Sequence, residues 1–226
     1  MLTMSESKLK NFLRWWVKAL NSGKYARYFE EVKKRGEFLP EVLTIFSSDC
    51  MAGLIYHSLG RKFYTPTINM SIRDADFLKL MEDYDYYKDR GLCFKSGKNY
   101  PVGFIGEGER SVIINFEHFT TNEEAASKWN ERKYRSQEIG ERFIIMADQN
   151  LTDREVERFK SLTAKRKIMF TWSPERADGR EIFAVKTYGR ERIKNYCKLR
   201  VYGFRDYERF FDYVAWLNME DHFVKE

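Results

Sequence analysis

The sequence VLTIFSSDCMAGLIYHS, residues 42–58, carries the signals that decide the fold. Its first part, Val42 to Phe46, is a short apolar run typical of a buried strand. The Ser47-Ser48-Asp49 run can turn the chain and cap a helix, which we expect over residues 50–58. A strand followed directly by a helix is the repeating unit of α/β proteins.

The same alternation continues along the chain. Two capping-box patterns, Thr121 to Glu124 and Thr152 to Glu155, each open a helix. The segment Gly106 to Glu109 joins two β-prone runs as a hairpin, so some strands must be antiparallel. The sequence therefore predicts a three-layer α/β/α fold with a mixed sheet. Further strands are expected at 66–70, 100–105, 111–116, 142–147, 167–172 and 182–187, and further helices over 74–87, 121–137, 152–162 and 206–219.

The chain is expected to divide into three parts: a basic amphipathic helical hairpin over residues 1–39, an α/β domain over 40–190, and a C-terminal basic segment with a helix packing on the domain over 191–226.

The N-terminal hairpin would pair a helix over residues 6–20 with one over 24–35, separated at Asn21-Ser22-Gly23. Its first helix has one apolar stripe that includes Trp16, and its Lys and Arg side chains lie on the other side. Such a helix can dock on the core or on a partner protein. Alternatively, it can bind an anionic membrane surface as a peripheral anchor.

The positive charge of the chain is concentrated at its two ends. The net charge is +6, yet residues 1–40 hold nine Lys and Arg against four Glu, and residues 186–205 hold seven against one. The remaining residues are therefore net acidic. No RRM, KH, zinc-finger or helix-turn-helix signature occurs, so we expect no nucleic-acid partner.

The sequence also bears on compartment, metals and cofactors. No secretory signal and no apolar run of about 20 residues is present, so we expect a cytoplasmic protein. The three cysteines form no C-x-x-C pair, and the two D-x-D strings, at Asp74 and at Asp83, read as a helix cap and as part of a helix. No glycine-rich phosphate loop is found. We therefore expect no metal and no cofactor.

The catalytic candidates come directly after strands, because ligands of open α/β sheets bind beyond the carboxyl ends of the strands. Cys50 lies at a helix N-terminus, where the helix dipole favours a thiolate. His118 could act as its base, and Asp148 could orient the histidine. Two observations oppose a nucleophilic Cys50: Asp49 would raise the pKa of the thiol, and a cysteine in a first helical turn is often a small buried residue.

The binding candidates lie beside them. The hydroxyls of Ser47 and Ser48 either cap the helix or hold a phosphate or carboxylate, and Asp49 adjoins them. Trp129 and Arg132 are three residues apart on one predicted helix and so share a face. Trp129 can cover a sugar ring or pack in the core, and Arg132 can hold a phosphate or a structural carboxylate.

Several motifs together resemble a known bacterial family. They are Thr44 to Tyr56, Tyr64 to Asn69, Tyr100 to Gly103, Phe116 to Phe119, and Glu123 to Ala125 with Lys128 to Arg132. The chain resembles, over about residues 42–172, a family of domains of unknown function whose members are commonly labelled exopolysaccharide or capsule biosynthesis proteins. Three positions depart from its usual pattern: Asp49 replaces Asn, Phe119 replaces Tyr and Lys133 replaces Arg. The resemblance implies an α/β/α layered fold and a role near surface-polysaccharide synthesis.

The sequence supports three functional hypotheses. The leading one is a transferase of surface-glycan assembly that binds a sugar nucleotide or glycan, with His118 as general base, Ser47, Ser48 and Arg132 on phosphate and Trp129 on the sugar. The second is a non-catalytic module that docks on a synthesis complex or a membrane through residues 1–39. The third is a Cys50-dependent enzyme that modifies acyl groups or glycans.

Overall fold

The computed structural model describes residues 22–95, 99–186, 193, 196–198, 200–201 and 204–225. Its centre is a parallel sheet with the strand order β1-β6-β7-β8. The register pairs Phe46 of β1 with Ile144 of β6, and Ile145 of β6 with Ile168 of β7. The strands are β1 (Thr44–Ser47), β6 (Arg142–Ala147), β7 (Arg166–Thr171) and β8 (Ile182–Ala184).

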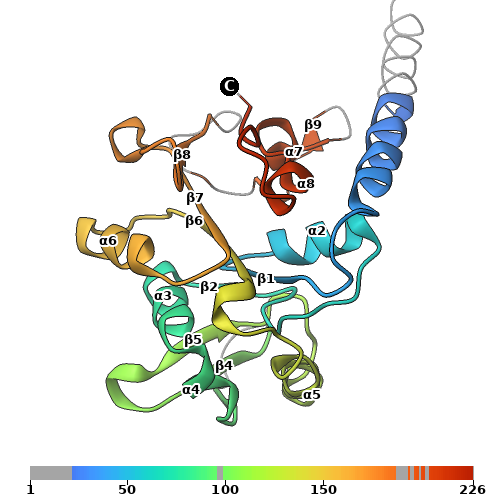
Figure 1. The fold of residues 1–226 in the computed structure, drawn as a ribbon. Coiled ribbons are helices and arrows are strands. Elements are labelled where there is room, and N and C mark those ends of the chain that lie inside the picture. The colour runs from blue at the N-terminus through green and yellow to red at the C-terminus, as the bar shows by residue number, and fades with distance from the viewer. Residues whose placement is uncertain are drawn as a thin grey trace, which may run out of the picture.

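The parallel sheet is buried on both faces because its side chains alternate between two apolar cores. In β6, Phe143 and Ile145 enter one core, whereas Ile144 and Met146 enter the other. The first core is shared with helices α2, α7 and α8, and the second with α3, α5 and α6 (Figure 1). The helices are α2 (Met51–Leu59), α3 (Asp74–Glu82), α4 (Tyr84–Lys88), α5 (Asn122–Lys133), α6 (Asp153–Ser161), α7 (Asp206–Phe210) and α8 (Tyr213–Leu217), with 3-10 turns at Gly108–Arg110, Ile139–Glu141 and Pro174–Arg176.

A second, antiparallel sheet has the order β2-β5-β4-β3. It meets the parallel sheet where the amide of Ile72 donates to the carbonyl of Ser48 over 2.8 Å. This bond places β2 beside the carboxyl end of β1. The strands are β2 (Ser71–Ile72), β3 (Cys93–Lys95), β4 (Val102–Ile105) and β5 (Val112–Asn115), and β9 (Arg200–Val201) pairs separately with β10 (Phe204–Arg205).

The predicted α/β class, with helices on both sides and both strand directions, is confirmed, although the strands divide between two sheets. The helix expected over 74–87 is interrupted at Asp83, whose side chain accepts the amide of Tyr86 and so starts α4. The helix expected over 206–219 is likewise divided, because Asp212 caps α8 through the amide of Ala215. The strand expected at 66–70 is replaced by the two-residue β2.

The described part of the N-terminal segment packs on the rest of the protein. Residues 22–36 are helical, so the expected helix end at Ser22 and Gly23 is not found there, while residues 1–21 lie outside the described part. Arg35 donates to Asp212 over 2.8 Å, and Val32 is buried in the first core. Tyr25 and Tyr28 both contact the ring of Phe204 edge-on, with centroids 5.2 Å away. Among the described residues, no helix combines the length and hydrophobicity that a bilayer crossing requires.

Candidate functional site

The carboxyl end of β1 turns directly into α2, and Ser47 holds this turn. Its hydroxyl donates to the carbonyl of Asp49 over 2.6 Å and accepts from the amide of Ala52 over 3.0 Å. The side chain of Asp49 accepts the amide of Met51 over 2.9 Å, which also favours the helix start. The hydroxyl of Ser47 is therefore committed to the turn, whereas Ser48 is buried and lines a cavity at the junction of the two sheets.

Cys50 and His118 lie side by side although 68 residues separate them in sequence. The Sγ atom of Cys50 is 3.5 Å from Nε2 of His118. Cys50 occupies the N-cap position of α2 and is partly buried, while His118 is exposed after β5. On either side of the histidine, Phe116 and Phe119 are buried with ring centroids 5.5 Å apart, and they leave the imidazole at the surface.

The electrostatic environment keeps Cys50 a neutral thiol. Burial first, and then the charges of Asp49 and Glu117, raise its pKa to about 11 against the opposing charges of Lys198 and Arg205. Catalytic thiolates normally lie in electropositive surroundings with a lowered pKa. At neutral pH the resting contact is therefore between a protonated thiol and the imidazole.

The carboxyl group of Asp49 is enclosed by residues from the C-terminal part of the chain. Cys197 Sγ lies 3.9 Å from Asp49 Oδ2, and the buried Tyr196 faces the same carboxyl group. Burial raises the pKa of Asp49 from its ordinary value and, with the charge of Asp49, raises that of Cys197 well above its own. No motif in the sequence indicated Tyr196 or Cys197, because their proximity to Asp49 arises only from tertiary packing.

Glu117 links the histidine to the antiparallel sheet. Its carboxylate accepts the hydroxyl of Ser71 over 2.8 Å and lies 3.5 Å from the ammonium of Lys198. Lys198 is well exposed, so this ion pair contributes little to stability. Its position matters more, because the charges of Glu117 and Lys198 both act on the Cys50 thiol, which contacts the imidazole of His118.

Asp148 lies apart from His118. It is fully buried, where Oδ1 accepts the amide of Leu151 over 2.9 Å and Oδ2 accepts Thr171 Oγ1 over 2.9 Å and Arg176 Nη1 over 3.0 Å. The carboxylate is thus occupied by the loop after β6 and the turn after β7. In the described part of the chain it makes no hydrogen bond to the histidine that it was expected to orient.

Among the described residues, neither Trp129 nor Arg132 makes a hydrogen bond or ring contact with Cys50 or His118. Trp129 is completely buried and packs edge-on against Phe116, with centroids 6.5 Å apart, so it has no face for a sugar. Arg132 is 8% exposed and sits over the ring of Phe63 at 5.1 Å, and burial lowers its pKa. Trp129 Nε1 and Arg132 Nε and Nη1 are buried without a hydrogen-bond partner among the described residues.

The cavity at the junction of the two sheets has a volume of about 430 Å³, and neither Cys50 nor His118 is among the described residues that line it. Ser48 and Asp49 line it from the end of β1, and Ser71 lines it from β2. Asp74, in the first turn of α3, accepts the amide of Gln149 over 2.7 Å. Burial raises the pKa of Asp74 to about 7, and the charges of Asp148 and Asp49 contribute to the rise, while the backbone amides of Gln149 and Asn150 oppose it. The Asp74 carboxyl can therefore accept or donate a hydrogen bond near neutral pH.

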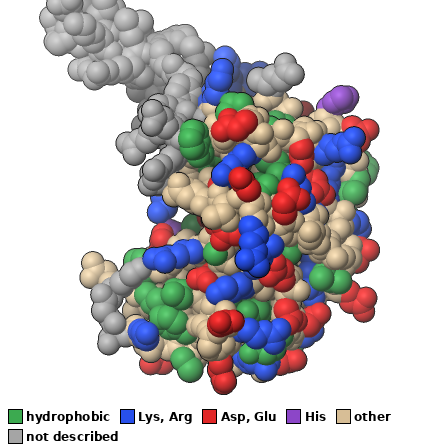
Figure 2. Space-filling view, turned by 90° about the vertical axis from the view of Figure 1, so that its left-hand side faces the viewer, with side chains coloured by type: hydrophobic (Ala, Val, Ile, Leu, Met, Phe, Trp, Pro, Cys, Tyr) green, Lys and Arg blue, Asp and Glu red, His purple; other side chains and the backbone are tan. Residues whose placement is uncertain are grey.

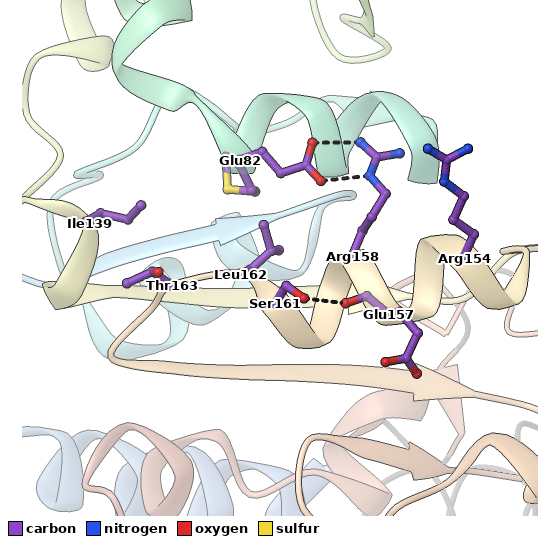
Figure 3. Close-up of a pocket in the computed structure, with 9 residues that line it drawn as sticks. Glu82, Ile139, Arg154, Glu157, Arg158, Ser161, Leu162 and Thr163 are labelled. Atoms are coloured by element: carbon purple, nitrogen blue, oxygen red, sulfur yellow. Dashed lines mark hydrogen bonds and ion pairs between the residues drawn. The ribbon is translucent and has the colours of Figure 1, made fainter.

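A second groove, of about 360 Å³, lies between α3 and α6 (Figure 3). Arg158 donates two hydrogen bonds of 2.7 Å to Glu82 across it, and Arg154 lies alongside. None of the predicted site residues lines this groove. The candidate site is therefore the strand-end cavity together with Cys50 and His118.

The surface charges and the side chains able to bind a metal limit which reactions the site can support. Over the face that Figure 2 presents, Lys and Arg side chains are interspersed with Asp and Glu. Within the described residues, no group of three His, Cys, Asp or Glu side chains is arranged to hold a metal ion. The groups that the site does offer are acid–base side chains and hydrogen-bond donors and acceptors.

Comparison with known proteins gives a family and a relative. The family described as "Domain of unknown function (DUF1919)" matches residues 21–218, a longer range than the motifs alone indicated. A protein of Haemophilus influenzae, described as an uncharacterized protein, is 28% identical over 198 residues, which cover 86% of this chain and 93% of the relative.

Proposed function

We propose that this chain, which belongs to the DUF1919 family of domains of unknown function, is a group transferase that acts on glycan hydroxyls. One observation carries the proposal: the exposed imidazole of His118 lies 3.5 Å from Cys50 at the carboxyl end of β1, where Asp49, which precedes Cys50, lines a cavity of mostly polar residues. This is where open α/β sheets bind their ligands.

In the proposed reaction, the imidazole of His118 takes the proton of an acceptor hydroxyl. The hydroxyl oxygen forms a bond to the anomeric carbon of an activated sugar, and the leaving group departs with the electrons of the broken bond. A positioned base of this kind accelerates a reaction by about 10²- to 10⁴-fold.

The leaving group needs a cation, and Arg132 is not available to supply it at this site. Lys198 and Arg205 are the two cations whose charges lower the pKa of the Cys50 thiol. Both come from the C-terminal part of the chain, and Lys198 is 61% exposed. In the proposal these two side chains meet the phosphate of the activated sugar.

The place of this reaction in surface-glycan assembly rests on the resemblance of the motifs to proteins labelled for exopolysaccharide or capsule biosynthesis. It is supported by the polar lining of the cavity, which suits a hydroxyl-rich substrate.

A second candidate reaction uses Cys50 as nucleophile, and the contact with His118 favours it. The thiol proton would pass to Nε2, and sulfur would bond to the acyl or glycosyl carbon of an activated substrate, while the bond from that carbon to its leaving group breaks and the leaving group departs with the electron pair. The raised pKa of the thiol and the two carboxylates beside it weigh against this route. Mass spectrometry after incubation with an acylating or glycosylating substrate would show a covalent adduct on Cys50 if this route operates.

Thermal unfolding with a panel of sugar nucleotides tests the leading proposal. A ligand at about 100 times its dissociation constant stabilises a protein by about 2.7 kcal/mol, which raises the Tm of a chain this long by about 5–10 °C. We expect at least one sugar nucleotide to do so, and Lys198→Ala to reduce the shift while His118→Ala keeps it. If every sugar nucleotide leaves the Tm unchanged, the proposal fails.

A further inference from the structure

The strand-end cavity contains side chains that the proposed reaction does not use. It is bounded by the end of β1, the first turn of α3 and the loop after β6, and its volume of about 430 Å³ is within the range of small-molecule sites. Its lining therefore bears on which substrate the chain holds, and the role assigned to that substrate rests on the proposed function.

Ser48 provides the first indication of a ligand. The residue is only 5% exposed and lines the cavity, and no described residue hydrogen-bonds its hydroxyl. Buried hydroxyls are normally satisfied, because burial without a partner is unfavourable. The Ser48 hydroxyl reaches the open space of the cavity, so an occupant of the cavity can supply its hydrogen-bond partner.

Two further polar residues line the cavity. The carboxyl group of Asp74 has one oxygen bonded to the amide of Gln149, and the exposed side chain of Asn150 comes next in sequence. Together with Ser48 these groups offer both donors and acceptors. The apolar side chains of Ile72 and Leu151 also line the cavity. Such a mixture suits a ring that carries several hydroxyls.

The charges disfavour an anionic occupant. Asp49, Asp74 and Glu155 line the cavity, against the single cation Arg73 among the described lining residues. A diphosphate or a uronate would meet more negative than positive charge here, which like-charge repulsion disfavours. The charge balance therefore indicates that the cavity does not bind the nucleotide diphosphate of the activated sugar.

Two residues that line the cavity connect it to the proposed base. Asp49 precedes Cys50, and Ser71 donates to Glu117, which precedes His118. We infer that the cavity is the acceptor subsite and binds a neutral pyranose of a glycan, with Ser48, Asp74 and Asn150 on its hydroxyls and one hydroxyl presented to His118.

Ligand-observed NMR and calorimetry on the full chain test this inference. The probes are the methyl glycosides of glucose, galactose and N-acetylglucosamine, with glucuronate and UDP as charged comparisons. We expect saturable binding of at least one neutral glycoside and weaker binding of glucuronate. Ser48→Ala, which removes a hydroxyl without breaking a bond to the described residues, should weaken the affinity about three- to tenfold.

Ser161→Ala is the matched control, because Ser161 lies in the groove between α3 and α6, and it should bind like the unaltered chain. Intact glycoside binding by an unaltered chain that shows no transferase activity would remove the proposed function and leave the glycoside site standing. Absence of saturable binding by all three neutral glycosides, or equal affinity of Ser48→Ala and the unaltered chain, would overturn the inference.

Discussion

Replacement of Asp74 by Asn should change how the stability of this protein depends on pH. Asp74 lies in the first turn of α3, where burial and the charges of Asp148 and Asp49 raise the pKa of its carboxyl from 3.8 to about 7. Below about pH 4 the carboxyl is protonated in both the folded and the unfolded chain. Between about pH 4 and 7 the folded chain keeps this proton and the unfolded chain releases it. A rise in pH through this window therefore destabilises the folded state.

The magnitude follows from the pKa. A rise from 3.8 to about 7 corresponds to about 4 kcal/mol over the whole window. Between about pH 5 and about pH 8, this carboxyl should lower the free energy of unfolding by about 2 kcal/mol, a value that allows for partial solvent access. An asparagine side chain at this position cannot ionise, and its amide oxygen can still accept the amide of Gln149. The variant should lack this part of the pH dependence.

Urea unfolding at about pH 5 and about pH 8 measures the effect. We expect Asp74→Asn to gain about 2 kcal/mol relative to the unaltered chain on going from the lower to the higher pH. Asp153→Asn is the matched control, because Asp153 also begins a nine-residue helix but its side chain is 97% exposed. Parallel pH dependence of Asp74→Asn and the unaltered chain would refute the reasoning.

Three further predictions concern single side chains. The Cys50 thiol has a pKa of about 11, so it should react with iodoacetamide at neutral pH at least about tenfold more slowly than the exposed Cys93. Peptide mass mapping measures the two rates, and a faster reaction of Cys50 would contradict its neutral state. Arg132→Met should raise the Tm by about 2–4 °C. Removal of the unpartnered buried N–H groups stabilises the fold by about 1 kcal/mol after the lost contact with Phe63 is subtracted. A fall in Tm would show that the guanidinium has a bound partner. Thr152→Ala removes the capping box of α6 and should lower the free energy of unfolding by about 1 kcal/mol, as urea unfolding would show. An unchanged urea midpoint would contradict this stabilising role of the cap.

Much of the fold could be predicted because local signals and packing agree. The run Arg142 to Ala147 has the composition of a buried strand, and β6 has these bounds because it lies between two cores. The stretch at 66–70 has a similar composition but forms a local turn. There Thr65 and Thr67 bond to each other over 3.1 Å, and the amide of Ile68 bonds to the carbonyl of Pro66. Such side-chain and backbone bonds compete with a strand and leave no trace in apolar periodicity.

The candidate site was predictable only in part. The rule that ligands bind beyond the strand ends places Cys50 and His118 in one region, and they do lie 3.5 Å apart. The rule does not predict that Asp148 is hydrogen-bonded to Arg176. It also does not predict that the helix face shared by Trp129 and Arg132 is buried. The enclosure of Asp49 by Tyr196 and Cys197 depends on packing between segments almost 150 residues apart, which no local pattern encodes.

Transfer to a neutral glycan, followed by mass spectrometry of the acceptor, tests the central claim most directly. The full chain is incubated with an oligosaccharide acceptor and a mixture of activated sugars, and the acceptor is examined for the mass of one added sugar. We predict this product with the unaltered chain and with His57→Ala, a matched control because His57 is an exposed histidine on α2. His118→Ala should form it about 10²- to 10⁴-fold more slowly. Equal rates for His118→Ala and His57→Ala, or no product from any of the three proteins, would contradict the account.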